Sequence, residues 1–129
     1  MTTNSDLHVL LVEDSTIIRN LIANIVNSVA GVSVTETVGS EADAIEAVHH
    51  GNVDVVILDL QLHTGTGFGV LRAMRKMARR PDVVVLTNFA LSMYRDSALA
   101  LGARHFLDKS RDYERLPGIL TEFAAARAS

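Results

Sequence analysis

Three carboxylates follow two short apolar runs in a pattern that could hold a metal ion. Glu13 and Asp14 come directly after the run ending at Val12, and Asp59 follows the run ending at Leu58. If they converge, two unit charges about 5 Å apart repel by roughly 3 kcal/mol at an effective dielectric constant of 20. Such a cluster is tolerable only if it is protonated or gains a cation, and its all-oxygen ligands suit Mg²⁺.

Two further polar residues follow later apolar runs and could complete a phosphoryl site. Thr87 comes directly after the run 82–86, and its hydroxyl can donate a hydrogen bond to an oxyanion. Lys109 follows the short mixed run 104–107 and supplies a fixed positive charge. With Asp59 as the nucleophile, these residue types predict a site for Mg²⁺ and a phosphoryl group.

The elements that must position these residues alternate between strand and helix patterns. Apolar runs typical of buried strands cover residues 8–12, 53–58 and 82–86, and weaker strand patterns cover 32–38 and 104–107. Helical periodicity predicts helices near 15–29, 40–48, 68–78, 91–101 and 117–126. This alternation predicts an α/β fold, a doubly wound five-stranded parallel sheet with helices on both faces.

The predicted strand order is 2-1-3-4-5, with the half-exposed second strand and the short fifth strand at the edges. In such sheets the functional crevice lies beyond the carboxyl ends of the strands, where the strand order reverses. Here that point falls between the first and third strands, which end at Glu13, Asp14 and Asp59. The sequence therefore predicts that the three carboxylates meet.

Several local patterns make finer predictions. One stripe of the first helix is expected to hold six apolar residues: Ile17, Ile18, Leu21, Ile22, Ile25 and Val26. Ser40 is expected to cap the second helix, Leu91 to join the apolar stripe of the fourth, and Gly102 to end it. Three glycines after the third strand, Gly65, Gly67 and Gly69, are interpreted as turn residues.

Composition limits the class of protein. The chain has 129 residues, of which 48% are hydrophobic and 21% charged, which indicates one folded domain over residues 1–129. It has no cysteine, which excludes disulfides and thiolate zinc sites and fits a reducing compartment. With no apolar run near the roughly 20 residues that span a bilayer and no signal-peptide pattern, a cytoplasmic protein is expected. Residues 1–6 are expected to be flexible.

The net charge of −3 is unevenly distributed. Residues 1–64 hold nine acidic side chains and one basic side chain, Arg19, whereas residues 65–129 hold eleven basic and six acidic ones. The two halves are expected to attract each other, so this asymmetry is weak evidence for an outside partner. The basic residues between Arg72 and Arg80 are interpreted as a solvated face, and direct DNA binding is not expected.

The motifs in order resemble the receiver domain of bacterial two-component response regulators. The resemblance covers essentially the whole chain and rests on Leu11–Ser15, Ile57–Leu62 with the glycines that follow, Val85–Thr87 and Phe106–Lys109. It implies that Asp59 is phosphorylated by a histidine kinase or a histidine phosphotransfer protein. It also implies a signalling module that is not a turnover enzyme.

The resemblance assigns further roles. Glu13, Asp14, Asp59 and the backbone carbonyl of Gln61 would coordinate Mg²⁺, the one implied cofactor. Thr87 and Lys109 would contact the phosphoryl oxygens, and Phe106 would turn inward on phosphorylation. That change would remodel the surface of the fourth helix, fifth strand and fifth helix, where an unidentified protein target binds. The sequence ends after the fifth helix, so a stand-alone receiver without an output domain is expected.

Three positions depart from the family pattern. The family usually has proline at the position of His63 and often has it at that of Ser110, and it usually has a small residue where Asn88 stands. These departures are expected to affect the rates of phosphorylation and dephosphorylation. They leave the five site residues unchanged, which are Glu13, Asp14, Asp59, Thr87 and Lys109.

Three other functions remain open at this stage. An Mg²⁺-dependent phosphohydrolase with an aspartate nucleophile needs a nearby acid or base, and neither Leu60 nor Gln61 can shuttle a proton. A flavin mononucleotide carrier of the same fold would place its phosphate in the first loop, where Glu13 and Asp14 would repel it. A phosphorylation-independent adaptor differs only in whether Asp59 is used.

Overall fold

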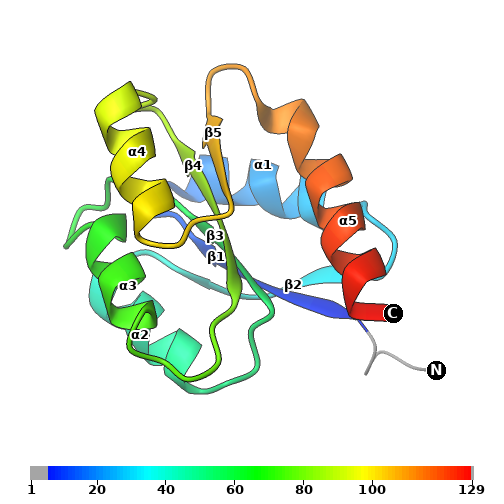
Figure 1. The fold of residues 1–129 in the computed structure, drawn as a ribbon. Coiled ribbons are helices and arrows are strands. Elements are labelled where there is room, and N and C mark those ends of the chain that lie inside the picture. The colour runs from blue at the N-terminus through cyan, green and yellow to red at the C-terminus, as the bar shows by residue number, and fades with distance from the viewer. Residues whose placement is uncertain (1–5, 129) are drawn as a thin grey trace.

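A computed structural model describes residues 6–128 of the chain. These residues form a parallel sheet of five strands in the order β2-β1-β3-β4-β5 (Figure 1). The strands are β1 (Leu7–Val12), β2 (Val32–Val38), β3 (Val55–Leu58), β4 (Asp82–Thr87) and β5 (His105–Asp108). The helices are α1 (Thr16–Asn27), α2 (Glu41–His49), α3 (Gly67–Met74), α4 (Ser92–Ala100) and α5 (Leu116–Ala128). The predicted doubly wound α/β fold and its strand order are confirmed. Of the segment 1–6 expected to be flexible, only Asp6 lies within the described residues.

Helices cover both faces of the sheet (Figure 1). Helices α1 and α5 pack on one face through a core that includes Val9 and Leu11 of β1. Helices α2, α3 and α4 pack on the other face, with Leu10 and Val12 of the same strand. Because successive side chains of a strand point to opposite faces, burial on both sides explains why β1 is continuously apolar. No helix within the described part of the chain has both the length and the apolar composition needed to span a bilayer.

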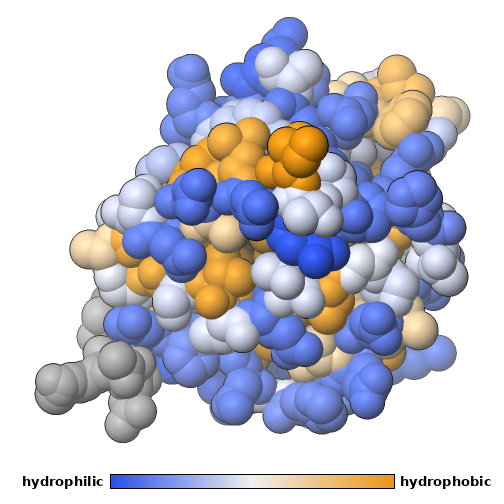
Figure 2. All heavy atoms as spheres, turned by 180° about the vertical axis from the view of Figure 1, so that it is seen from behind, coloured by the Kyte–Doolittle hydropathy of each residue, from blue (hydrophilic) through white to orange (hydrophobic). Residues whose placement is uncertain are grey.

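The apolar stripe predicted for α1 is narrower than expected. Ile22 and Val26 are buried, but Ile17 is 80% exposed and Leu21 is 43% exposed. Each of these two residues precedes a packed residue by one position, and one position turns an α-helix by about 100°, away from the sheet. Leu91 was likewise expected to pack, but it precedes α4 as its N-cap and is 54% exposed. Figure 2 shows hydrophobic patches among hydrophilic residues on the rear face of the molecule.

The pairing of β2 with β1 is interrupted by a bulge. Val9 of β1 pairs with Val34, but Leu10 pairs with Glu36, so Thr35 is an extra residue without a partner in β1. A shift of one residue exchanges the two faces of a strand. Val34 therefore packs with the α1 and α5 side, and Val38 packs with the opposite side.

The predicted helix ends are confirmed at two points and wrong at a third. The Ser40 hydroxyl accepts a hydrogen bond from the Asp43 amide at 3.1 Å, and Gly102 has a left-handed φ of 111°. Helix α3, however, ends at Met74 instead of continuing to residue 78. There the Met77 amide donates to the carbonyl of Met74, three residues back, so the chain tightens into a turn.

Candidate functional site

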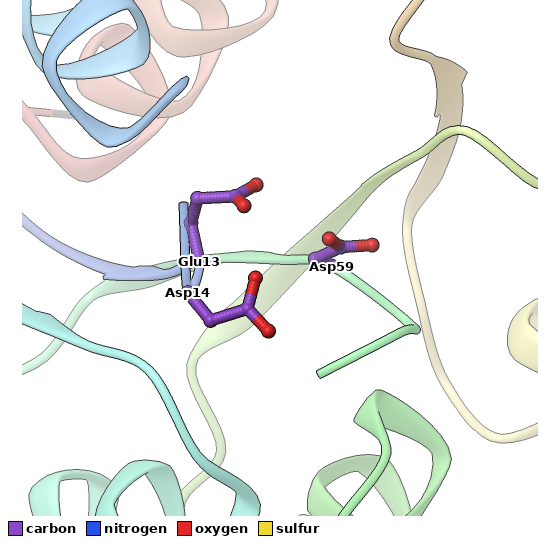
Figure 3. A group of neighbouring side chains, drawn as sticks. All are labelled: Glu13, Asp14 and Asp59. Carbon is purple, nitrogen blue, oxygen red and sulfur yellow. The ribbon is translucent and has the colours of Figure 1, made fainter. Parts of the chain in front are cut away.

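Three carboxylates meet at the carboxyl edge of the sheet (Figure 3). Glu13 and Asp14 directly follow β1, and Asp59 directly follows the neighbouring strand β3. One oxygen from each of the three carboxylates lies within 4.8 Å of the others. Glu13 and Asp59 are buried, whereas Asp14 is partly exposed. The structure thus brings these three predicted residues together where the strand order reverses.

Lys109 lies among these acids. Its Nζ is 2.5 Å from Glu13 Oε1 and 2.9 Å from Asp59 Oδ2, and the three side chains are buried. Burial lowers the pKa of Lys109, but its hydrogen bonds to Glu13 and Asp59 outweigh burial and raise that pKa above its ordinary value. One ammonium neutralises one of the three carboxylates, so the cluster keeps two negative charges, which match a divalent cation.

Backbone amides fix the orientation of two of these carboxylates. The Gln61 amide donates to Asp59 Oδ1 at 3.2 Å, so both oxygens of Asp59 have a partner. The Ser15 amide donates to Glu13 Oε2 at 3.0 Å, and the Ser15 hydroxyl caps α1 by accepting from the Ile18 amide. The turn from β1 into α1 therefore holds Glu13 toward Lys109.

Arg19 supports the site in a way that the sequence patterns do not reveal. Its Nε and Nη2 donate to the backbone carbonyl of Glu13 at 3.1 and 2.7 Å. The guanidinium thus fixes the chain at the first acid and adds a positive charge near the cluster. A contact between an arginine side chain and a carbonyl six residues earlier has no sequence signature. The one available signal was that Arg19 is the sole basic residue of positions 1–64.

The loop between β3 and α3 is attached to the start of α2 through Glu41. The Glu41 amide donates to the Thr64 carbonyl at 3.1 Å, and the Thr66 amide donates to Glu41 Oε1 at 2.9 Å. A Cβ at Gly69 would lie 2.1 Å from Glu41 Oε2, so glycine leaves room for this carboxylate. This loop carries Gln61, whose carbonyl is one of the expected metal ligands.

The interpretation of all three glycines as turn residues is wrong for Gly67 and Gly69, which form the first turn of α3. The physical reason at Gly67 is close packing. A Cβ there would lie 2.5 Å from the backbone oxygen of Asp59 and 2.9 Å from Leu60 Cα. Only glycine lets α3 begin this close to the end of β3. Gly65, with a φ of 86°, is a turn residue as predicted.

A cavity of about 390 Å³ is lined by the acids and Lys109, and also by Asn88 and Phe89. Thr87 and Phe106 do not line this cavity. Thr87 is fully buried, and its Oγ1 accepts a hydrogen bond from the Phe89 amide at 3.2 Å, which leaves its hydroxyl proton available. Phe106 is half-buried against the core on the α2, α3 and α4 side. The structure therefore does not place these two residues in the lining of the cavity with the acids and Lys109.

Two of the three departures from the family pattern, His63 and Asn88, line the cavity, and the third, Ser110, directly follows Lys109. The His63 amide donates to Asp14 Oδ2 at 2.6 Å, and its ring Nε2 lies 3.8 Å from the same oxygen. The Ser110 amide and hydroxyl donate to Asp108 Oδ1, and these two bonds, the hydroxyl's first, lower the pKa of Asp108. Proline has no amide proton and could make neither backbone bond.

Comparison with known proteins gives consistent matches. The family model described as response regulator receiver domain matches residues 9–121. A protein-glutamate methylesterase/protein-glutamine glutaminase of Myxococcus xanthus is 36% identical over 80% of this chain and 28% of its own length. A protein of the same name from Treponema denticola is 31% identical over 81% of this chain and 28% of its own length. The chain thus spans less than a third of these relatives.

Solved structures agree on the fold. The response regulator domain of Thermotoga maritima CheB superposes with a TM-score of 0.82 at 21% identity, covering 96% of this chain and 98% of that domain. The response regulatory domain of protein mrkE from Klebsiella pneumoniae superposes with a TM-score of 0.83 at 20% identity, covering 95% and 98%. At these identities, the superpositions show a shared fold.

Proposed function

The chain belongs to the response regulator receiver domain family, and on that basis we propose that Asp59 accepts a phosphoryl group from a histidine kinase or a histidine phosphotransfer protein. The observation that carries the proposal is the placement of the Asp59 carboxylate. It lines a cavity, beside two further acids and 2.9 Å from the Lys109 ammonium. No other described group of acids combines these features.

The donor set fits Mg²⁺. Its oxygens come from Glu13, Asp14 and Asp59, and Gln61, whose carbonyl is the fourth expected ligand, lines the same cavity and donates its amide to Asp59. Hard oxygen ligands and a residual charge of two suit a small divalent cation that keeps waters for a phosphate to replace. When bound, Mg²⁺ would neutralise charge on the transferring phosphoryl group.

The chain's own residues supply the remaining chemistry. A carboxylate oxygen of Asp59 attacks the phosphorus of a phosphohistidine, forming a P–O bond while the P–N bond breaks. The freed imidazole nitrogen takes up a proton, and an acyl phosphate remains on Asp59. Lys109, already within hydrogen-bond distance of Asp59, pairs with the added charge of about −1.5 to −2. The hydroxyl of Thr87 donates to a phosphoryl oxygen when it moves toward the site.

The output of phosphorylation is a change in the protein surface that a partner contacts. Phosphorylation draws Thr87 toward the phosphoryl group and lets Phe106 turn inward, which alters the face formed by α4, β5 and α5. Phe106 now lines a groove on that face, so its movement changes what a partner contacts. The shift depends on contacts that differ between the two states, not on charge alone.

A turnover phosphohydrolase is the second candidate, and the site favours it less. Leu60 is buried and Gln61 offers an amide, so neither residue next to Asp59 can carry a proton. We do not assign methylesterase activity to this chain, because the chain matches less than a third of the length of each relative with that name. We place the module in the cytoplasm, in keeping with a sequence without cysteine.

Mass spectrometry after incubation with acetyl phosphate and Mg²⁺ tests the assignment. We expect one phosphoryl group on the wild-type protein, none on Asp59→Asn, and wild-type labelling of Asp96→Asn, a matched change at an exposed aspartate of α4. Labelling should disappear when EDTA removes the metal. Labelling that survives in Asp59→Asn would overturn the acceptor assignment. If the wild-type protein is labelled neither by acetyl phosphate nor by histidine kinases, a phosphorylation-independent adaptor would explain the chain better than a phosphoacceptor.

A further inference from the structure

A second cavity, of about 650 Å³, lies at the amino ends of the strands, at the edge of the sheet opposite the acids. Its lining comes from the start of β1 (His8), the end of α2 (His49), the loops before β3 and β4, and the end of α5 (Arg127). Helix α5 ends beside the start of β1 (Figure 1), which brings Arg127 to this edge. The phosphoacceptor cavity shares no lining residue with this one, so a ligand here would leave the phosphorylation site free.

The lining of this cavity carries an excess of positive charge. Three arginines line it, and Asp54 is its one acid. The Asp54 carboxylate accepts hydrogen bonds from the Arg127 guanidinium and, at 2.8 Å, from the His8 amide, so its charge is already paired. Arg79 and Arg80 form no side-chain hydrogen bond or ion pair within residues 6–128. With Asp54 counted against Arg127, these two arginines leave the lining with two uncompensated positive charges.

Neighbouring acids do not supply the missing charge. The expected attraction between the two halves of the chain is only partly realised, because of the basic residues in 65–128 only Lys109 and Arg127 pair with acids of residues 6–64. Asp82, which follows the cavity lining in the chain, pairs with Arg104 at 2.9 Å. The two free arginines of the cavity therefore remain available to an anion from outside the chain.

The two free arginines also have no role at a helix end. Arginines at this edge can offset the partial negative charge of the carbonyls that end a helix. Arg75 does so, because its Nη1 donates to the carbonyl of Ala100, the last residue of α4, at 3.1 Å. Arg79 and Arg80 make no such bond within the described part of the chain, although they follow α3 closely.

We propose that this cavity binds a phosphorylated sugar, with its phosphate on Arg79 and Arg80. A phosphate group carries about −1.5 to −2 charge at neutral pH, which matches two uncompensated guanidinium groups. Guanidinium groups also form paired hydrogen bonds with phosphate oxygens, which gives the contact a defined geometry. The inference does not depend on the proposed function, because it concerns other residues at the opposite edge of the sheet.

The rest of the lining suits the sugar. The exposed side chains of Asn52 and His49 can exchange hydrogen bonds with its hydroxyl groups. Val53 and Met77 are half-buried against the core and offer apolar contact for its C–H groups. A volume of about 650 Å³ is in the range of cavities that hold small ligands.

A sugar phosphate fits this lining better than a nucleotide or a nucleic acid. No phenylalanine, tyrosine or tryptophan lines the cavity, so a base has none of these rings to stack on. The net charge of −3 opposes a polyphosphate at long range. Two free arginines match the charge of one phosphate group and not that of a row of them.

The amide resonances of isotope-labelled protein, titrated in EDTA with ribose 5-phosphate and with glucose 6-phosphate, test the proposal. We expect saturable binding of at least one of them with a Kd below about 1 mM, and the largest shifts at Asn52, Arg79 and Arg80. The double variant Arg79→Ala, Arg80→Ala should weaken this binding about tenfold or more. The matched control Arg72→Ala, Arg95→Ala removes the same charge from exposed helix positions outside the cavity and should bind within about twofold of wild type.

Comparison ligands separate the phosphate from the sugar. Inorganic phosphate and the unphosphorylated sugars should each bind about tenfold more weakly or worse, because each makes only part of the contacts. Inorganic phosphate that binds as tightly as the sugar phosphates would overturn the assignment of a sugar. The same conclusion would follow if AMP bound more tightly than both sugar phosphates and lost its binding in Arg79→Ala, Arg80→Ala.

Two further results would overturn the cavity as a binding site. One is the absence of saturable binding by either sugar phosphate, and the other is an equal loss of affinity in the two double variants. Asp59→Asn should bind the sugar phosphate as wild type does, because Asp59 lines the other cavity. Loss of binding in Asp59→Asn would place the ligand among the acids and contradict the proposal.

Discussion

The Lys109 ammonium lies 2.9 Å from Asp59 Oδ2, so the expected phosphoacceptor is already paired with the cation that would hold its phosphoryl group. The same ammonium contacts Glu13 at 2.5 Å, on the neighbouring strand end. Lys109 therefore ties the ends of β1, β3 and β5 together in the unmodified protein. Its two contacts make it both a structural element and the group best placed to respond to new charge on Asp59.

Lys109→Met tests the structural part of this role. The change leaves Glu13 and Asp59 buried without their cation, and loss of one partner from a buried ion pair costs about 3–5 kcal/mol. We expect the free energy of unfolding, measured by urea denaturation in EDTA, to fall by about that amount. Lys76→Met, at the only other lysine and an exposed one, should change it by less than about 0.5 kcal/mol. Equal stability of the two variants would contradict the account.

Stability at alkaline pH should depend on the same lysine. Burial lowers the pKa of Lys109, but the hydrogen bonds and charges of Glu13 and Asp59 raise it above its ordinary value of 10.5 in the folded state. A folded-state pKa above the unfolded one stabilises the protein below pH 10.5, and this stabilisation is lost as the pH rises through the folded-state value.

Denaturation of wild-type protein and Lys109→Met across this alkaline range measures the effect. The wild-type protein should lose stability more steeply than Lys109→Met, which has no ammonium to titrate. Asp59→Asn removes one charge that raises the pKa of Lys109, so its loss should begin at lower pH than in wild type. Superimposable alkaline profiles for wild type and Lys109→Met would refute this linkage.

Gly67→Ala should disturb the phosphoacceptor through the backbone. Its Cβ would lie 2.5 Å from the Asp59 carbonyl oxygen and 2.9 Å from Leu60 Cα, and neither backbone atom can move aside cheaply. We expect a loss of about 1–3 kcal/mol in unfolding free energy and slower labelling by acetyl phosphate.

The matched control for Gly67→Ala is Gly118→Ala in α5, where no atom beyond the adjacent residues and the backbone of the same helix lies within 4 Å of the added Cβ. Alanine is the better helix former, so this control should gain up to about 1 kcal/mol. If Gly67→Ala were as stable and as readily labelled as wild type, the close packing of α3 against β3 would not matter for the site.

The fold was predictable because its signals are local and repeated. Apolar runs such as Val55–Leu58 are buried on both faces, and strand and helix alternate five times, which leaves few ways to wind the sheet. Errors arose where a single residue decides the geometry. The bulge at Thr35 and the rotation of Ile17 away from the sheet depend on tertiary packing that no short pattern records.

The convergence of Glu13, Asp14 and Asp59 was likewise predictable, because topology alone places the ends of neighbouring parallel strands together. The residues that hold the site in position through the backbone were not predictable from the sequence. Arg19 and Glu41 act through carbonyl and amide groups of other segments, and backbone groups carry no sequence-specific signal. The same holds for the amide of His63, whose bond to Asp14 depends on how the loop folds back.

A Mg²⁺ titration of isotope-labelled protein, followed through its amide resonances, tests the central claim most directly: that the clustered acids form a site for a divalent ion beside Asp59. We predict saturable binding of one ion, with the largest shifts at Glu13, Asp14, Asp59 and Gln61. Asp14→Asn should weaken binding about tenfold or more, and Asp96→Asn should bind as wild type does. Shifts that grow without saturation, or that are the same in Asp14→Asn as in wild type, would contradict the claim.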